Sequence, residues 1–232
     1  MMEHRETVIM NQTKKTVSIV LKLIVIISAA TGVYLSWQSG KNSFMGGSRV
    51  FMFFTIQSNI AAAIVCAMDL WTMGKEHPGT IWPLVRFVTA VSITLTGMVF
   101  CFVLAPTLGK YAWNLQNVLT HVVVPLGAVA DFFVTGTPSC IRKSRVIHVT
   151  LPPLAYALYA GIAYVMKWEF FDGVYYPYFF LNWGSPCGAF GFSSELPFMG
   201  CVWWILALLI FLIAVGRLYL FLPDLLKRKS EK

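Results

Sequence analysis

The chain has 232 residues, of which 57% are hydrophobic and only 12% are charged, and its formal net charge is +8. Soluble globular proteins carry about 25% charged residues, so the composition excludes an ordinary soluble domain. The basic residues lie mostly in short connections and at the ends of apolar segments, which is typical of membrane topology signals rather than of nucleic-acid binding. We therefore expect an integral membrane protein with no separate soluble domain and no nucleic-acid partner.

Six segments are apolar enough to be membrane-spanning helices, each of which needs about 20 mostly apolar residues. The first follows Lys14 and Lys15 as a signal peptide would, but its apolar run extends to Trp37, beyond the usual core of about 7–15 residues. It is therefore read as a retained helix. The predicted fold class is an all-α integral membrane protein, a single bundle of six transmembrane helices at residues 17–37, 50–72, 84–106, 113–134, 146–167 and 199–221, with flanking segments at 1–16 and 222–232.

The distribution of Lys and Arg predicts the orientation, because these residues accumulate on the cytoplasmic side of membrane proteins. With the N-terminus inside, only four of the 18 Lys and Arg residues lie on the outer side, namely Lys41, Arg49, Lys110 and Lys167. Both termini are thus predicted to be cytoplasmic, and a long loop at about 168–198 is predicted to lie outside. We expect a multi-pass membrane protein.

His121 is an ionisable residue within the fourth apolar segment, where burial is costly unless the side chain is paired or faces protein or water. At about 1.5 Å per residue, it lies about 12 Å from the outer end of its helix, and Thr55 lies about 7 Å from the outer end of the second helix. Helix tilt can absorb the difference, so the two can share a level if these helices are neighbours. Each also has a structural interpretation, as a group bonded within its own helix or to an adjacent one.

Other polar side chains accompany this pair. Ser58 and Asn59 follow the threonine by three and four residues, and Asn117 precedes the histidine by four, so each set shares one helix face. Bonds between helices are the structural interpretation of such residues. Tyr178 in the long loop is a candidate polar contact, although the aromatic residues of that loop favour a belt at the membrane interface.

Two carboxylates, Asp69 and Asp131, lie near the predicted inner ends of the second and fourth helices. We expect them to reach cytoplasmic water or to pair with a basic residue such as Arg86, which we favour over a proton or ion pathway. Lys22 and Arg86 lie near helix ends and are expected to extend their charges to the membrane surface. The five cysteines show no paired spacing and no cluster with His, so no disulfide framework, metal or cofactor is expected.

The Thr55 hydroxyl becomes a nucleophile when a neutral imidazole within hydrogen-bond reach takes its proton, and the same imidazole can later protonate the leaving alcohol. His121 is the candidate base. Acyl transfer also needs donors to the oxyanion. Candidates for oxyanion or substrate binding are Ser58, Asn59, Asn117 and Tyr178. No clear carboxylate accompanies the histidine to complete a triad.

The six-segment plan and two short stretches, Phe53-Phe54-Thr55-Ile56-Gln57-Ser58-Asn59 and Leu119-Thr120-His121-Val122-Val123-Val124-Pro125, resemble the FAR/AIG-like family. This family includes androgen-induced-gene and ADTRP proteins and bacterial six-pass relatives. Animal members are membrane threonine hydrolases that cleave fatty acid esters of hydroxy fatty acids. The resemblance, over about residues 15–222, implies a nucleophile at Thr55 and its partner at His121. The bacterial relatives have largely no assigned activity, so the substrate stays open.

The sequence thus predicts a membrane-embedded lipid ester hydrolase, with membrane lipids around it and a lipid ester as substrate. One alternative is a carrier or channel in which His121, Asp131 and Asp69 form a polar path through the membrane. Another is a sensor or assembly subunit whose polar stripes only join helices. Protein partners and the oligomeric state do not follow from the sequence.

Overall fold

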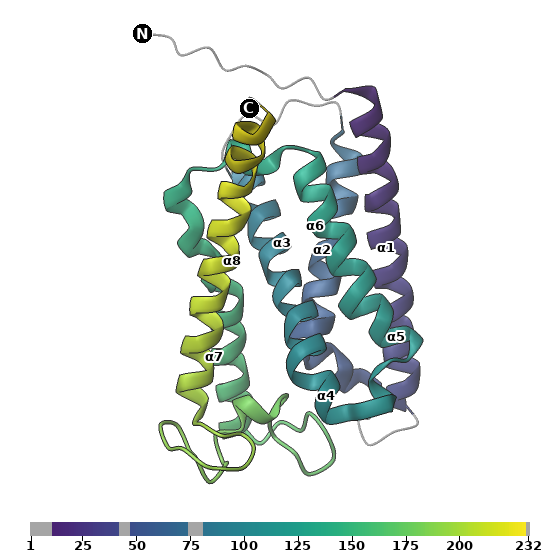
Figure 1. Ribbon diagram of the computed structural model, residues 1–232. Coiled ribbons are helices and arrows are strands. Elements are labelled where there is room, and N and C mark those ends of the chain that lie inside the picture. Colours follow the sequence, from purple (N-terminus) through teal and green to yellow (C-terminus); the bar gives the residue numbers. More distant parts are fainter. Residues whose placement is uncertain (1–10, 42–46, 74–80, 231–232) are drawn as a thin grey trace.

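Six membrane-length helices run side by side in a computed structural model that describes residues 11–41, 47–73 and 81–230 (Figure 1). Each overlaps one predicted segment, so the number and the positions of the spans are confirmed. The described ranges contain two isolated β-bridges and no longer strand. The chain therefore has the architecture of a multi-pass membrane protein, with candidate spans Gln12–Lys41, Phe54–Trp71, Ile81–Ala112, Leu115–Val134, Lys143–Val165 and Cys201–Pro223.

Four of the helices enclose most of the core. Helix α1 (Gln12–Lys41) packs against α2 (Phe54–Trp71) and α6 (Val124–Val134), and α3 (Ile81–Val99) packs against the same two helices from the other side. Helix α2 also contacts the turn η4 (Leu119–Val123), which carries the histidine. The condition that the second and fourth spans be neighbours is therefore met.

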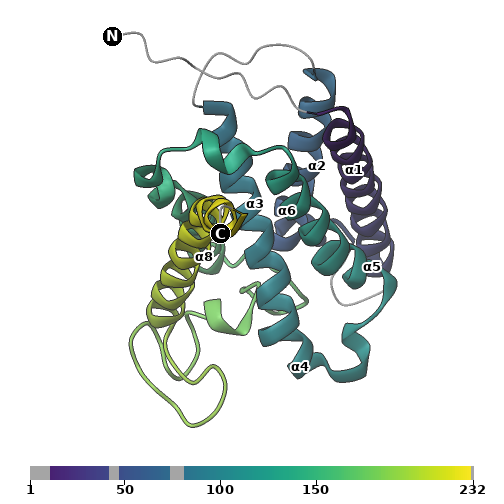
Figure 2. The same cartoon turned by 45° about the horizontal axis from the view of Figure 1, so that its top comes forward.

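The last two spans flank α3 rather than α1. Helix α7 (Leu151–Val165) and helix α8 (Cys201–Ser230) both contact α3. Figure 2 shows α8 on the side of α3 away from α1. Between them runs the long connection, whose one helical turn is η7 (Phe179–Leu181). The start of α1 and the end of α8 lie at one end of the bundle, and the long connection lies at the other (Figure 1).

Several span ends depart from the predicted ones, and the largest departure occurs at a proline. The third span was expected to end at Pro106 but continues through η2 (Phe100–Leu104), α4 (Ala105–Leu108) and η3 (Gly109–Ala112). The fourth begins with α5 (Leu115–Val118). Short 3-10 turns complete the connections, namely η1 (Gly47–Met52), η5 (Thr137–Cys140) and η6 (Lys143–Thr150).

The fifth span begins as the 3-10 turn η6, and Pro152 and Pro153 follow one residue after its end. Neither proline has a backbone N–H, so the carbonyls of His148 and Val149 lose their α-helical partners. The N–H of Leu151 bonds the carbonyl of His148, three residues earlier, in the 3-10 pattern. A regular α-helix then starts at Leu151.

A buried network of charges lies toward the end of the bundle at which α1 starts. Lys22 was expected to extend to the membrane surface, which is wrong: the residue is 1% exposed, and its Nζ lies 2.6 Å from Oδ1 of Asp131. Arg86 bonds Asp69 at 2.9 Å and Asp131 at 3.0 Å, so the expected pairing of the carboxylates is confirmed. Ser18 and Trp82 donate further bonds to the two carboxylates.

An apolar layer separates this network from the other half of the bundle. Along each of the four central helices, its members lie between the charged residue and the opposite end of the helix. Because they are buried and in mutual contact, they form an apolar cluster next to the network. The layer consists of Val25, Ala29, Ala62, Cys66, Ile93 and Val124.

Candidate functional site

A cavity of about 490 Å³ lies beyond the apolar layer, at the end of the bundle that carries the long connection. Thr55, Asn117, His121 and Tyr178 all line it, although they come from α2, α5, η4 and the long connection. Most of the remaining wall is apolar. Four of the six residues singled out from the sequence thus meet at one cavity.

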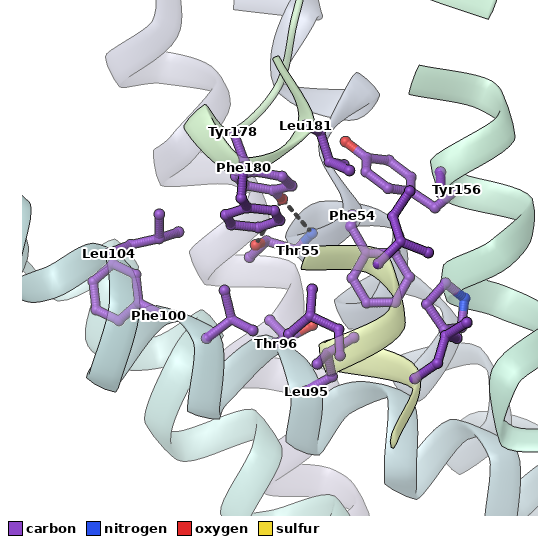
Figure 3. Close-up of a pocket in the computed structure, with 16 residues that line it drawn as sticks. Phe54, Thr55, Leu95, Thr96, Phe100, Leu104, Tyr156, Tyr178, Phe180 and Leu181 are labelled. Atoms are coloured by element: carbon purple, nitrogen blue, oxygen red, sulfur yellow. Dashed lines mark hydrogen bonds between the residues drawn. The ribbon is translucent and has the colours of Figure 1, made fainter. Parts of the chain in front are cut away.

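Thr55 occupies the first turn of α2. The residue before the helix, Phe53, has no side-chain acceptor, so the first N–H groups of α2 lack a side-chain cap. The N–H and Oγ1 of Thr55 each lie 3.5 Å from Oη of Tyr178. Figure 3 shows the tyrosine hydroxyl directed at Thr55. The threonine hydroxyl therefore lies at a positive helix end, which favours negative charge on a nearby oxygen.

Tyr178 was expected to belong to an interfacial aromatic belt, but it inserts into the bundle instead. Its ring stacks on Phe180 at 5.1 Å between centroids and packs edge-on against Phe53. Burial raises the pKa of the Tyr178 phenol above its ordinary value. The phenol is therefore a neutral hydrogen-bond donor at physiological pH.

The imidazole of His121 is held in one tautomer. Its Nδ1 lies 3.0 Å from the backbone oxygen of Asn117 and 3.0 Å from the hydroxyl of Thr120, which donates its own proton to the carbonyl of Gln116. Because a carbonyl oxygen can only accept, Nδ1 carries the proton, and Nε2 carries a lone pair. The ring stacks on Phe100 with 3.8 Å between centroids, which fixes its plane. An oriented imidazole with a free Nε2 lone pair has the form that a general base requires.

Two wide helical turns shape the wall of the cavity, and the sequence analysis did not foresee them. Phe100 opens the π turn η2, and His121 lies in the π turn η4. In each case the N–H after the turn bonds the carbonyl five residues earlier, and the next residue is proline, Pro106 or Pro125. Widening the turn relieves the clash between a proline ring and the carbonyl four residues before it. The prolines that follow the two turns, Pro106 and Pro125, were the feature of the sequence that could have indicated them.

Two of the predicted oxyanion donors lie elsewhere. Ser58 does not line the cavity of Thr55 and His121, and its hydroxyl bonds the Thr55 carbonyl at 3.0 Å and Thr96 at 2.7 Å. Asn59 is fully buried, and its amide nitrogen donates to the carbonyls of Thr55 and Thr120. With both of its amide hydrogens used, Asn59 joins α2 to η4 and has none left for an oxyanion.

Asn117 lines the cavity but also forms hydrogen bonds within its own segment. Its side-chain nitrogen donates to the carbonyl of Ala112 at 2.8 Å, and its backbone N–H is capped by Asn114. One amide hydrogen remains for a ligand. The polar stripe seen in the sequence is thus partly a helix start, with Asn114 as the N-cap.

Thr55 and His121 line the same cavity, but no hydrogen bond joins them in the described part of the chain. A smaller cavity of about 60 Å³ also touches Thr55 and is lined mostly by apolar residues from α3, η2, α7, α8 and the long connection (Figure 3). Thr55 therefore lines two largely apolar spaces. No three metal-binding side chains come together in the described ranges.

Comparisons of the chain with known proteins return nothing: no family model, no curated protein and no solved structure matches it.

Proposed function

We propose that this protein is a membrane-embedded lipid ester hydrolase in which Thr55 is the nucleophile and His121 is the base. The observation that carries the proposal is the shared cavity, which is lined by a threonine at a helix N-terminus and by a histidine whose Nδ1 contacts a backbone carbonyl, an arrangement that leaves Nε2 as the acceptor. The resemblance of the two motif stretches to membrane threonine hydrolases supports the same roles. We also propose that both termini are cytoplasmic and that the protein resides in a bacterial plasma membrane.

In the first step, Nε2 of His121 takes the proton of Thr55 as Oγ1 attacks the ester carbonyl. The tetrahedral intermediate collapses, the alcohol leaves with the proton held by the imidazole, and the acyl group stays on Thr55. Water then attacks the acyl-threonine, with His121 as base and then as acid, and releases a fatty acid. The reaction needs no cofactor.

The oxyanion has two sources of stabilisation near Thr55. One is the neutral hydroxyl of Tyr178, and the other is the positive N-terminal end of α2, which has no cap from the side chain of Phe53. Donors aimed at a developing charge in an apolar site account for much of the rate enhancement in acyl transfer. The apolar walls of the two cavities provide room for the hydrocarbon parts of an ester.

The test uses the purified protein in detergent with a fluorophosphonate probe and an assay of fatty acid release from ester lipids. Thr55→Ala should abolish both labelling and release, while Thr55→Ser should retain part of each. Thr72→Ala is the matched control, because Thr72 lies at the far end of α2. The proposal is wrong if wild-type protein shows neither signal or if Thr55→Ala leaves both unchanged.

A further inference from the structure

A second site lies on another side of α2, in a groove of about 400 Å³ between α2, α3 and α7. It shares no residue with the cavity of Thr55 and His121. Its size falls within the range of ligand sites, about 300–1,000 Å³. The lining carries no charged side chain. Thr89 and Ser92 of α3 place hydroxyls on its floor, and the α2 and α7 walls are largely apolar but add the uncharged polar side chains of Gln57, Ser58, Tyr156 and Tyr159.

Ser92 on the floor of this groove has an unusual environment. It is 6% exposed, and its Oγ has no hydrogen-bond partner among the described residues. A helical serine or threonine commonly bonds the carbonyl four residues earlier, as Thr94 does to Ala90 at 2.7 Å. A buried hydroxyl without a partner costs free energy, so an acceptor in the groove would be stabilised.

The position of Ser92 along α3 limits what the acceptor can be. The residue lies 11 positions after Ile81, or about 16 Å along the helix. The hydrocarbon core of a bilayer is about 30 Å thick, so this hydroxyl lies near its middle. An ionised headgroup is strongly disfavoured there, and the groove has no charged residue to pair with one.

The surroundings of the groove identify the medium that it faces. Ile64 on α2 and Leu151 on α7 are both more than half exposed in helices that are long and apolar enough to span a membrane. Such flanks face acyl chains rather than water. The ligand chemistry that fits is therefore a hydrocarbon chain that carries an uncharged oxygen.

We propose that this groove is a binding site for a neutral acyl lipid, whose chain lies between α2 and α7 and whose hydroxyl or carbonyl oxygen accepts a hydrogen bond from Ser92. The site is separate from the ester hydrolase activity and does not depend on it. Phe54 and Tyr156 line both this groove and the small cavity next to Thr55. A lipid held here is thus one aromatic wall away from the candidate nucleophile.

The test measures photocrosslinking of full-length protein in nanodiscs by a diazirine-bearing monoacylglycerol, with the labelled peptide identified by mass spectrometry. Ala155→Trp fills the groove from an exposed position of α7 and should reduce labelling at least tenfold. Leu158→Trp is the matched control, since this exposed residue of α7 does not line the groove. Its labelling should equal that of the wild type.

Ser92→Ala tests the hydrogen bond. It should weaken labelling by the monoacylglycerol about three- to tenfold, as expected for one hydrogen bond, and leave labelling by a diazirine alkane unchanged. A lysophosphatidic acid probe of the same chain length should label poorly. If Ala155→Trp fails to fold, Ala155→Leu provides the same comparison with a smaller side chain.

Three outcomes would overturn the proposal. The first is full labelling of the groove-filling variant, and the second is equal labelling by the anionic probe. The third is an unchanged result for Ser92→Ala, which would mean that the hydroxyl binds a buried water only.

Discussion

Tyr178 is the residue that connects the long loop to the chemistry of the site. Its hydroxyl lies 3.5 Å from both the N–H and the Oγ1 of Thr55, while its ring is held between Phe53 and Phe180. Because burial raises its pKa, the phenol keeps its proton well into the alkaline range. It can therefore donate to an oxyanion without itself acting as a base.

Replacing Tyr178 by Phe should remove this donor and retain the ring packing. We expect kcat for ester hydrolysis to fall about 10²-fold or more, the usual cost of losing one oxyanion donor. Fatty acid release by purified variants measures the effect. The control is Tyr176→Phe, a nearby tyrosine that does not line the cavity. An equal loss in both variants would mean that Tyr178 has no specific role.

At the residue scale, four of the residues predicted from the sequence line one cavity, namely Thr55, Asn117, His121 and Tyr178, while Ser58 and Asn59 do not. Periodicity predicts the face of a helix on which a residue lies, but not which neighbouring element packs against that face at each turn. Thr55 lies at the helix end, where the cavity begins. Asn59, one turn deeper, already lies in the close contact between α2 and η4, where its amide satisfies carbonyls.

At the scale of helices, small residues set the position of His121. A Cβ added at Gly97 of α3 would lie 2.8 Å from the carbonyl oxygen of His121 and 3.3 Å from Pro125. A Cβ at Gly32 of α1 would lie 2.6 Å from the side chain of Thr120. Close approach of helix backbones at small residues is a general means of packing in membranes. The histidine turn is therefore held from two sides.

Gly97→Ala should push α3 away from the histidine turn, because the nearest atom is backbone and cannot rotate aside. We expect the free energy of unfolding to fall by about 1–3 kcal/mol, as for other overpacked sites. Thermal unfolding in mild detergent measures it. Gly161→Ala is the matched control, since its added Cβ has only one neighbour, 3.8 Å away, and alanine favours a helix. If Gly97→Ala leaves the free energy of unfolding unchanged, the contact between α3 and the histidine turn is not closely packed.

Helix existence was predictable at this scale, whereas helix geometry near proline was not. The apolar runs are long, and each produces one span. Hydropathy carries no information about whether a proline ends a helix, as assumed for Pro106, or is accommodated by a wide turn before it. That choice depends on packing against neighbouring helices, which a single segment does not reveal.

At the scale of the whole molecule, each of four helices contributes one charge to the buried network. Lys22, Asp69, Arg86 and Asp131 come from α1, α2, α3 and α6, and their formal charges cancel. Since both carboxylates of the network are paired with basic side chains from other helices, the network has the properties of a tie between helices. The sequence suggested the pairing with Arg86 but not the participation of Lys22. Hydropathy indicates how deep a residue lies in the membrane, but not which side chains it contacts.

Lys22→Met should leave the network with an uncompensated negative charge. We expect the free energy of unfolding to fall by about 3–5 kcal/mol, the usual cost of breaking a buried pair from one side. Adding Asp131→Asn removes the excess charge and should recover much of the loss. Thermal unfolding in detergent of the single and the double variants tests this. No recovery in the double variant would contradict the charge balance.

The orientation of the bundle can be tested with a native cysteine. Cys140, in the turn that follows α6, is a free thiol and the only one of the five cysteines that is exposed, and all five lie in described ranges. The predominance of Lys and Arg around this end predicts that it faces the cytoplasm. A membrane-impermeant maleimide should therefore leave Cys140 unlabelled in intact cells and label it after permeabilisation. Ser194→Cys, at an exposed position in the long loop, should react in intact cells. The reverse labelling pattern would mean that the protein has the opposite orientation, with the cavity of Thr55 and His121 in the inner half of the membrane.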